Sequence, residues 1–166
     1  MKLNILPMTQ PEAKEIAANW HYDGVYAFYD RDVNTHEFAQ FLSVQSRRDD
    51  YFSVFADGEL IGFFSFKENE KGIVDMDCGM KPSWTGKGWG IQFMPFGIDF
   101  IVKRSHPSVI RVDLPLFNHR ALSLVRRLGF EPVHEYSHQV DKHPYTFLQM
   151  VYWVRGDETS YHKEFK

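Results

Sequence analysis

The sequence predicts an α/β or α+β fold within one domain. Its 166 residues are 43% hydrophobic and 25% charged, which is typical of a globular domain of this length. Strand-like and helix-like segments follow each other in the order β α α β β β α β α β β. Two strands rich in Phe and Val, residues 51–56 and 60–67, flank Asp57-Gly58, a dipeptide suited to a tight hairpin turn. We expect one domain over residues 1–154 and a polar tail over residues 155–166.

The chain is predicted to begin with a short strand and a capped helix. Residues 2–7 alternate weakly between apolar and polar side chains, which indicates the strand. Thr9 can then cap a helix that Pro11 enters in its first turn and that ends near Trp20.

An aromatic segment and a second helix follow. Residues 20–30 hold five aromatic rings with neither helical nor strand periodicity, which predicts an irregular aromatic loop. Asn34 or Thr35, together with Glu37, resembles a capping arrangement and begins a short helix through Leu42.

A third strand and a long helix are predicted after the hairpin. Residues 73–80 alternate strictly, so Asp75 and Asp77 share one face of that strand. Apolar residues recur at helical spacing over residues 88–104. Pro95 removes one backbone donor within this helix, and we expect it to kink the helix or to shift its start.

The last elements are a strand, a helix and two more strands. Residues 109–115 are rich in β-branched side chains, and Asn118 can cap a helix that Gly129 ends. Strands over residues 131–140 and 145–154 complete the order.

Composition excludes several classes of function. The net charge of −3 argues against a nucleic-acid binder, which needs a concentrated basic face. A single cysteine, Cys78, cannot form an internal disulfide. The sequence has no run of the roughly 20 apolar residues that a membrane span requires and no apolar signal core at its start, so we expect a cytoplasmic protein.

The segment Thr85-Gly86-Lys87-Gly88-Trp89-Gly90 is the strongest functional motif. Three alternate glycines leave backbone N–H groups unshielded at a helix N-terminus, where a phosphate or pyrophosphate is favoured. It is not a P-loop, because Gly88 follows Lys87 where Ser or Thr is required. A tight turn without a ligand is the alternative.

Two motifs together resemble the GNAT superfamily of acyl-CoA-dependent N-acyltransferases. Asn118-His119-Arg120-Ala121 with Leu128-Gly129-Phe130 is similar to its second signature, and the glycine segment is similar to its first. The resemblance covers roughly residues 2–154 and implies a mixed, mostly antiparallel sheet of six to seven strands flanked by about four helices. It also implies acetyl-CoA as co-substrate, with no metal.

The resemblance implies specific contacts to acetyl-CoA. Backbone amides of the glycine segment would hold the pyrophosphate, and the pantetheine arm would run along the end of the third strand. Asn118 would contact the cofactor from the second motif. The implied cofactor-binding residues are Gly79, Met80, Thr85, Gly86, Lys87, Gly88, Trp89, Gly90, Ile91 and Asn118.

The sequence departs from the family pattern in three places. Thr85 replaces the usual Gln or Arg, which removes a long side chain but no amide. Val125 stands where many members place a tyrosine that protonates the leaving thiolate, so no general acid carries over there. Pro95 lies within the cofactor helix.

Acyl transfer needs a base for the amine and donors for the oxyanion. Asp75, favoured slightly over Asp77, is the candidate base, because the family often places an acid on that strand; solvated strand residues are the alternative. Backbone N–H groups near Gly79 or Met80 are the expected oxyanion donors. Tyr136 is a candidate to protonate the thiolate, unless it is a core residue.

The acceptor is expected to be a small-molecule or peptide amine, with no nucleic acid and no membrane as partner. Aromatic content of 16% exceeds what the core obviously needs, so the aromatic loop is predicted to wall the acceptor cavity; a packed loop is the alternative. Members of the family are often dimers, but no segment identifies an interface. The candidate acceptor-binding residues of the aromatic loop are Trp20, Tyr22, Tyr26, Phe28 and Tyr29.

Rival functional assignments are weaker. His134 and His138 share a strand face, but a third ligand for a metal is not evident, even with His143. A calcium loop beginning at Asp30 fails because Thr35 stands where Gly is needed. The alternative to an enzyme is a non-catalytic binding module of the same fold, which binds coenzyme A or acyl-CoA.

Overall fold

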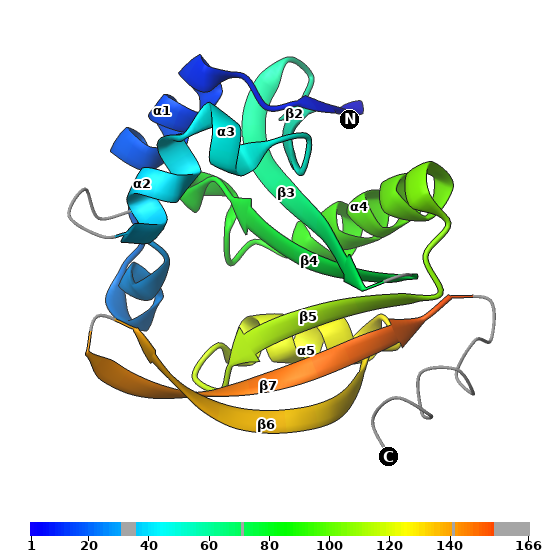
Figure 1. The fold of residues 1–166 in the computed structure, drawn as a ribbon. Helices are drawn as coiled ribbons and strands as arrows, with labels where there is room; N and C mark the ends of the chain where they lie inside the picture. The colour runs from blue at the N-terminus through cyan, green and yellow to red at the C-terminus, as the bar shows by residue number, and fades with distance from the viewer. Residues whose placement is uncertain (31–35, 71, 141, 155–166) are drawn as a thin grey trace. The chain divides into compact units, whose positions relative to one another are not determined.

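The computed structural model describes residues 1–30, 36–70, 72–140 and 142–154. It contains one seven-stranded sheet in the order β1-β2-β3-β4-β5-β7-β6 (Figure 1). The β4–β5 pair is parallel, while β1–β2, β2–β3, β5–β7 and β6–β7 are antiparallel. This confirms the predicted mixed, mostly antiparallel fold. The elements are β1 (Leu3–Pro7), α1 (Gln10–Asn19), η1 (Gly24–Tyr29), α2 (His36–Leu42), α3 (Val44–Arg47), β2 (Tyr51–Ala56), β3 (Glu59–Glu70), β4 (Ile73–Met80), η2 (Pro82–Trp84), α4 (Gly90–Ser105), β5 (Val109–Pro115), α5 (His119–Arg127), β6 (Glu131–Val140) and β7 (His143–Trp153).

The chain divides into two compact units, which are described in turn. The first comprises Met1–Ser65 and Cys78–Lys87, and the second comprises Phe66–Asp77 and Gly88–Lys166. Within the described residues, no helix is both long enough and apolar enough to cross a membrane.

The first unit combines the N-terminal helices with the β2–β3 hairpin. Thr9 caps α1 as predicted, and Glu12 completes the capping box, since its side chain accepts from the Thr9 N–H at 3.1 Å. Asp57 and Gly58 have positive φ angles of 49° and 88°, as the predicted hairpin turn requires. A buried cluster forms where α1 and α2 meet β3; its members are Ala13, Ile16, Ala17, Trp20, Phe41, Leu60 and Phe63.

A buried arginine ties the helices of the first unit together. Arg47, at the end of α3, is only 3% exposed. Its guanidinium donates to the carbonyl of Phe41 and to Oε1 of Gln10, both at 2.6 Å. Burial lowers the pKa of Arg47 from its usual value, because the charged form loses water. These contacts link α3 to α2 and α1.

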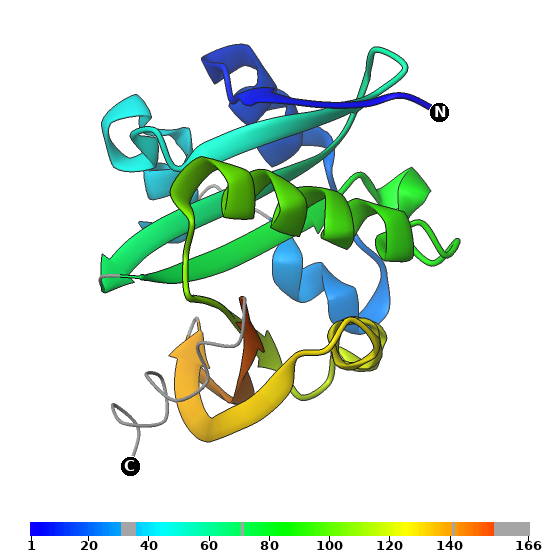
Figure 2. The same ribbon diagram turned by 90° about the vertical axis from the view of Figure 1, so that its right-hand side faces the viewer.

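The second unit contains the β5–β7–β6 strands with α4 and α5. Helix α5 lies against one face of β5 and β7 in both views (Figures 1 and 2), and it buries Leu122 and Val125. Helix α4 packs against the second half of β3 through Phe100 and Phe66, whose ring centres are 5.9 Å apart. The α4 and α5 helices approach closely, since a Cβ on Gly90 would lie 2.7 Å from a methyl carbon of Leu124.

Some expected elements differ in the structure. The aromatic segment is not irregular, because Gly24–Tyr29 form a 3₁₀ helix. Helix α3 was not expected; Ser43 caps it by accepting from the Ser46 N–H at 3.2 Å. Strand β7 begins at His143, so the connecting turn is shorter than predicted. The expected caps Asn34 and Thr35, and the tail over residues 155–166, lie outside the described residues.

Pro95 does not break α4. The helix is continuous over Gly90–Ser105 and contains Pro95 as its sixth residue. A proline there has no N–H for the carbonyl of Ile91, four residues earlier. Ile91 is 40% exposed, so water can reach this first turn and replace the missing bond.

Candidate active site

The glycine segment forms a sharp turn into α4. Gly86 and Gly88 have φ angles of 71° and 83°, a region that other residues enter at a cost. Helix α4 begins at Gly90, and the N-cap residue Trp89 makes no side-chain capping hydrogen bond. Backbone N–H groups at this end therefore remain without a side-chain cap, as an anion site at a helix N-terminus requires.

Gly88 and Gly90 serve different purposes in this turn. A Cβ on Gly88 would meet no atom within 4 Å, so open space lies beside the backbone. Gly90 instead faces Leu124 of α5, and a larger residue at this position would collide with the Leu124 side chain. The segment thus has one glycine that leaves room for a ligand and one that lets two helices approach.

The end of β4 is held by aromatic side chains of the first unit. Gly79 lies against Phe63, because a Cβ on Gly79 would come within 2.8 Å of the ring carbon Cζ. The hydroxyl of Tyr22 donates to the Met80 carbonyl oxygen at 2.7 Å. The Lys81 N–H donates to the Ile61 carbonyl, also at 2.7 Å. This backbone, predicted to meet the pantetheine and the oxyanion, is therefore tightly positioned.

Asp30 closes the aromatic segment on itself. Its Oδ1 accepts from the Tyr22 N–H at 2.7 Å, and its Oδ2 lies 3.3 Å from Nδ1 of His21. Between these residues, Phe28 and Tyr29 make an edge-to-face contact with ring centres 5.2 Å apart. Four of the five predicted acceptor-binding rings, Tyr22, Tyr26, Phe28 and Tyr29, are half-buried.

Trp20 differs from these four rings. It is 2% exposed and packs in the cluster around Phe63, with ring centres 6.3 Å apart. Its buried indole N–H has no hydrogen-bond partner among the residues that the structure describes. Trp20 is therefore a core residue of the first unit, in the cluster against which Tyr22 packs.

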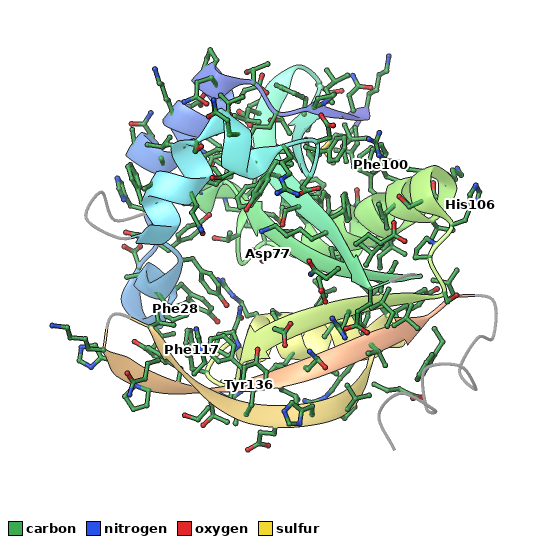
Figure 3. All side chains as sticks on the ribbon, viewed as in Figure 1. Phe28, Asp77, Phe100, His106, Phe117 and Tyr136 are labelled. Carbon is green, nitrogen blue, oxygen red and sulfur yellow. The ribbon has the colours of Figure 1, made fainter. Side chains whose placement is uncertain are left out.

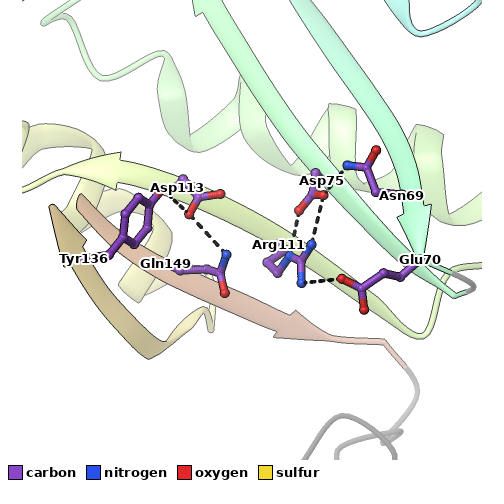
Figure 4. A network of polar contacts seen from close by, with 7 residues as sticks. All are labelled: Asn69, Glu70, Asp75, Arg111, Asp113, Tyr136 and Gln149. Atoms are coloured by element: carbon purple, nitrogen blue, oxygen red, sulfur yellow. Dashed lines mark hydrogen bonds and ion pairs between the residues drawn. The ribbon is translucent and has the colours of Figure 1, made fainter. Parts of the chain in front are cut away.

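Asp75 on β4 is bound to a buried arginine. Arg111, 8% exposed on β5, donates from Nε to Oδ1 of Asp75 at 2.7 Å and from Nη2 to Oδ2 at 3.0 Å (Figure 4). Asn69 adds a 2.7 Å bond to Oδ2, and Glu70 lies 3.4 Å from Nη1 of Arg111. Both carboxylate oxygens of Asp75 are thus occupied, and its charge is balanced.

Asp77 and Tyr136 are the other predicted catalytic residues in the second unit (Figure 3). Asp77 shares the face of Asp75 and is exposed. Tyr136 on β6 donates its hydroxyl hydrogen to Oδ1 of Asp113 at 2.8 Å. Partial burial first, then this bond and the charges of Asp113 and Asp75, raise the pKa of Tyr136 above its usual value.

Three further polar residues on this face are not predicted from the sequence. Arg111 and Asp113 alternate on β5, and Gln149 of β7 pairs in register with Asp113 and donates to its Oδ1 at 3.2 Å. Two charged residues that lie two positions apart in an otherwise apolar strand, such as Arg111 and Asp113, indicate that the strand has one polar face.

The remaining predicted residues have simpler surroundings. Asn118 caps α5, since its Oδ1 accepts from the Ala121 N–H at 3.1 Å, and it is 8% exposed. Val125 is 2% exposed on α5. Cys78 is half-buried. Within the ranges that the structure covers, no three His, Cys, Asp or Glu residues lie close enough together to hold a metal ion.

Comparisons with known proteins identify the family and the fold. A model of the Acetyltransferase (GNAT) family matches residues 13–130. No curated protein matches the chain. Among solved structures, spermidine N-acetyltransferase from Vibrio cholerae in complex with CoA and spermine has a TM-score of 0.75 at 15% identity, over 94% of this chain and 98% of that one.

Two further structures share the fold. The protein yncA from Salmonella typhimurium, solved with its cofactor acetyl-CoA, has a TM-score of 0.67 at 15% identity, over 93% of this chain and 95% of that one. An N-acetyltransferase from Staphylococcus aureus Mu50 has a TM-score of 0.68 at 13% identity, over 92% and 99% of the two chains.

Proposed function

Because the chain belongs to the GNAT acetyltransferase family, we propose that it transfers the acetyl group of acetyl-CoA directly to a primary amine. The observation that carries this proposal is the glycine turn into α4, with open space at Gly88 and no side-chain cap at Trp89. Similarity of fold to an enzyme solved with CoA and spermine, and to yncA solved with acetyl-CoA, supports it.

Acetyl-CoA would be held mainly by backbone. Amides from Thr85 to Ile91 suit its pyrophosphate, because the positive end of the α4 dipole lies there. Asn118 Oδ1 accepts the hydrogen bond that caps α5, so the Nδ2 amino group of its side chain would face the cofactor. When bound, acetyl-CoA supplies the thioester carbonyl that the amine attacks.

We assign the role of base to Asp77 because the contacts of Asp75 argue against Asp75. Asp75 accepts three hydrogen bonds, two of them from Arg111, so it has little capacity left to take a proton. Asp77 is exposed on the same face. A carboxylate becomes an adequate base once the C–N bond begins to form, because the attached N–H then becomes much more acidic.

Backbone and solvent would complete the reaction. The N–H groups of Gly79 or Met80 are placed on a strand end that Phe63 and Tyr22 hold rigidly, as a preorganised oxyanion donor must be. Tyr136 already donates its hydrogen to Asp113 and has a raised pKa, so it is a poor acid for the thiolate. We propose that a water molecule protonates the leaving thiolate of coenzyme A.

A small cationic amine is the acceptor that fits best. The half-buried rings of Tyr22, Tyr26, Phe28 and Tyr29 would form its wall. The net charge of −3 attracts cations weakly over distance. One of the solved structures with this fold holds spermine.

A non-catalytic acyl-CoA-binding module is the second candidate. It is favoured by Val125, which is buried where many members carry a tyrosine, and by the engaged hydroxyl of Tyr136. Binding of acetyl-CoA without thiol release for any amine in a broad panel would favour this module over the enzyme.

Thermal denaturation with acetyl-CoA tests both candidates. A ligand that binds only the folded state must raise Tm. Gly88→Ala should abolish the rise, because the new methyl group enters the space beside the amides. Gly58→Ala is a matched control: Gly58 also has positive φ, 88°, and open space, but lies in the β2–β3 turn. No rise for the unmodified protein, or equal loss in both variants, would refute the assigned site.

A further inference from the structure

The carboxylate of Asp113 accepts hydrogen bonds at only one of its two oxygens from the residues that the structure describes. Both of its hydrogen bonds, from the Tyr136 hydroxyl and the Gln149 amide, end on Oδ1. Its Oδ2 receives no hydrogen bond from any residue that the structure describes. Both donors are neutral, so they orient the carboxylate without cancelling its negative charge.

Asp75 provides the contrast. Its two oxygens accept three bonds, and the guanidinium of Arg111 balances its charge. Figure 4 shows Arg111 against Asp75 and Glu70. Asp113 forms no ion pair with any residue that the structure describes. Of these two aspartates, only Asp113 therefore combines a fixed orientation with an open oxygen and an uncompensated charge.

Asp113 lies on the same face of the sheet as the proposed base, just beyond the last paired residues of β4 and β5. The β4–β5 register ends at Asp75 and Arg111, and Asp77 and Asp113 each follow two residues later on their strands. Side chains two residues apart share a face, so Asp77 and Asp113 lie on the same face of neighbouring strands. The stacked rings of His134, Tyr136 and Phe147, with centres 5.6 Å apart, extend this face beyond Asp113.

We propose that Asp113 is a specificity-determining residue, whose Oδ2 binds a second ammonium group of a diamine acceptor while Asp77 serves the reacting amine. This proposal rests on the proposed function. An ammonium has N–H donors for Oδ2, and the methylene chain between two amino groups can lie over the rings. The preferred substrate class is therefore diamines and longer polyamines, rather than monoamines.

A pair of probes isolates the second ammonium group. Butane-1,4-diamine and butylamine have the same carbon chain and differ by one amino group. Asp113→Asn keeps the shape and loses the charge, so the ratio of kcat/KM for the diamine to that for butylamine should fall about tenfold, as loss of a charged hydrogen bond predicts. Tyr136→Phe keeps the charge and loses only its orientation, so the ratio should fall less.

Asp99→Asn is the control for general electrostatics. Asp99 is an exposed carboxylate of the same unit, paired with Lys103 on α4, and its loss should leave the ratio within twofold. An unchanged ratio in Asp113→Asn, or the same change in Asp99→Asn, overturns the proposal. Preserved acetyl-CoA-induced Tm shifts show that the variants are folded.

Failure of the proposed function is distinguishable from failure of this inference. If the unmodified protein acetylates neither probe, calorimetry measures binding of the two amines directly. Tighter binding of the diamine that Asp113→Asn removes supports the inference without turnover. Equal binding of both amines to the unmodified protein overturns it.

Discussion

The hydroxyl of Tyr22 donates a 2.7 Å hydrogen bond to the carbonyl oxygen of Met80, the last residue of β4. Two residues that are 58 positions apart in the sequence are thereby joined. The bond links the aromatic segment, where we place the acceptor, to the strand end that we expect to position the thioester.

Tyr22→Phe should lower the free energy of unfolding by about 1 kcal/mol, because one half-buried hydrogen bond is lost and the carbonyl loses a partner. Urea unfolding measures this change. Tyr152→Phe is the control, since no hydrogen bond of that hydroxyl is found within the described part of the chain. Equal losses in the two variants would show that the bond to Met80 contributes nothing specific.

Gly79→Ala should lower the free energy of unfolding by about 1–3 kcal/mol, because the added methyl group overlaps the buried ring of Phe63. Phe63→Leu in the same chain removes the ring carbons that cause the overlap. The two substitutions together should therefore cost less than the sum of the single ones, as a double-mutant cycle in urea can measure. Strict additivity would contradict the contact.

Asp75→Asn should lower the free energy of unfolding by about 2–3 kcal/mol, since it removes the closer of the two carboxylates that pair with the buried Arg111. The loss stays below that of a fully buried pair because the Asp75 side chain is 25% exposed. Asp99→Asn, which breaks the exposed pair with Lys103, should cost about 0.5 kcal/mol or less.

The same variant separates structure from catalysis. Per folded molecule, Asp75→Asn should reduce kcat much less than Asp77→Asn does. The opposite order in a thiol-release assay would return the role of base to Asp75.

Alkaline pH should expose the environment of Tyr136. Its pKa is raised above the usual value of 10.0, so the folded state keeps a proton that the unfolded chain releases. The stability that this group adds is present below about pH 10 and is lost as the pH rises further. Above pH 10, stability should fall more steeply with pH in the unmodified protein than in Tyr136→Phe, by up to about 1.4 kcal/mol per pH unit.

Absorbance of the tyrosinate form gives a second measurement at this position. Asp113→Asn should lower the pKa of Tyr136 toward its usual value without restoring it, because burial, the larger cause, remains. A Tyr136→Phe variant with an unaltered slope of stability against pH would disprove the assignment.

Strands with strong local patterns were predicted well. The bounds of β4, β5 and β6 agree with the alternation and the β-branched content of their segments. The shared face of Asp75 and Asp77 followed from that alternation. The GNAT resemblance, drawn from two short motifs, is confirmed by the family model over residues 13–130.

Contacts between distant strands could not be predicted in the same way. Alternation places Asp113, Tyr136 and Gln149 on faces of their own strands, but only the β5–β7–β6 register brings them together. The partner of Asp75 likewise depends on its alignment with Arg111 in the β4–β5 pair. The sequence favours Asp75 as base only because it does not reveal this pairing with Arg111.

Strand β6 stands at the end of the sheet order, so no strand among the described residues pairs with its outer backbone groups. Such an edge can recruit a strand from another molecule and begin aggregation. Here the edge carries Pro132, which lacks an N–H, and the register with β7 shifts between Pro132 and His134. Most of its side chains are polar and exposed. These features make β6 a poor template for intermolecular pairing. We therefore expect the protein to resist edge-to-edge aggregation at the high concentrations that calorimetry of weakly bound amines requires.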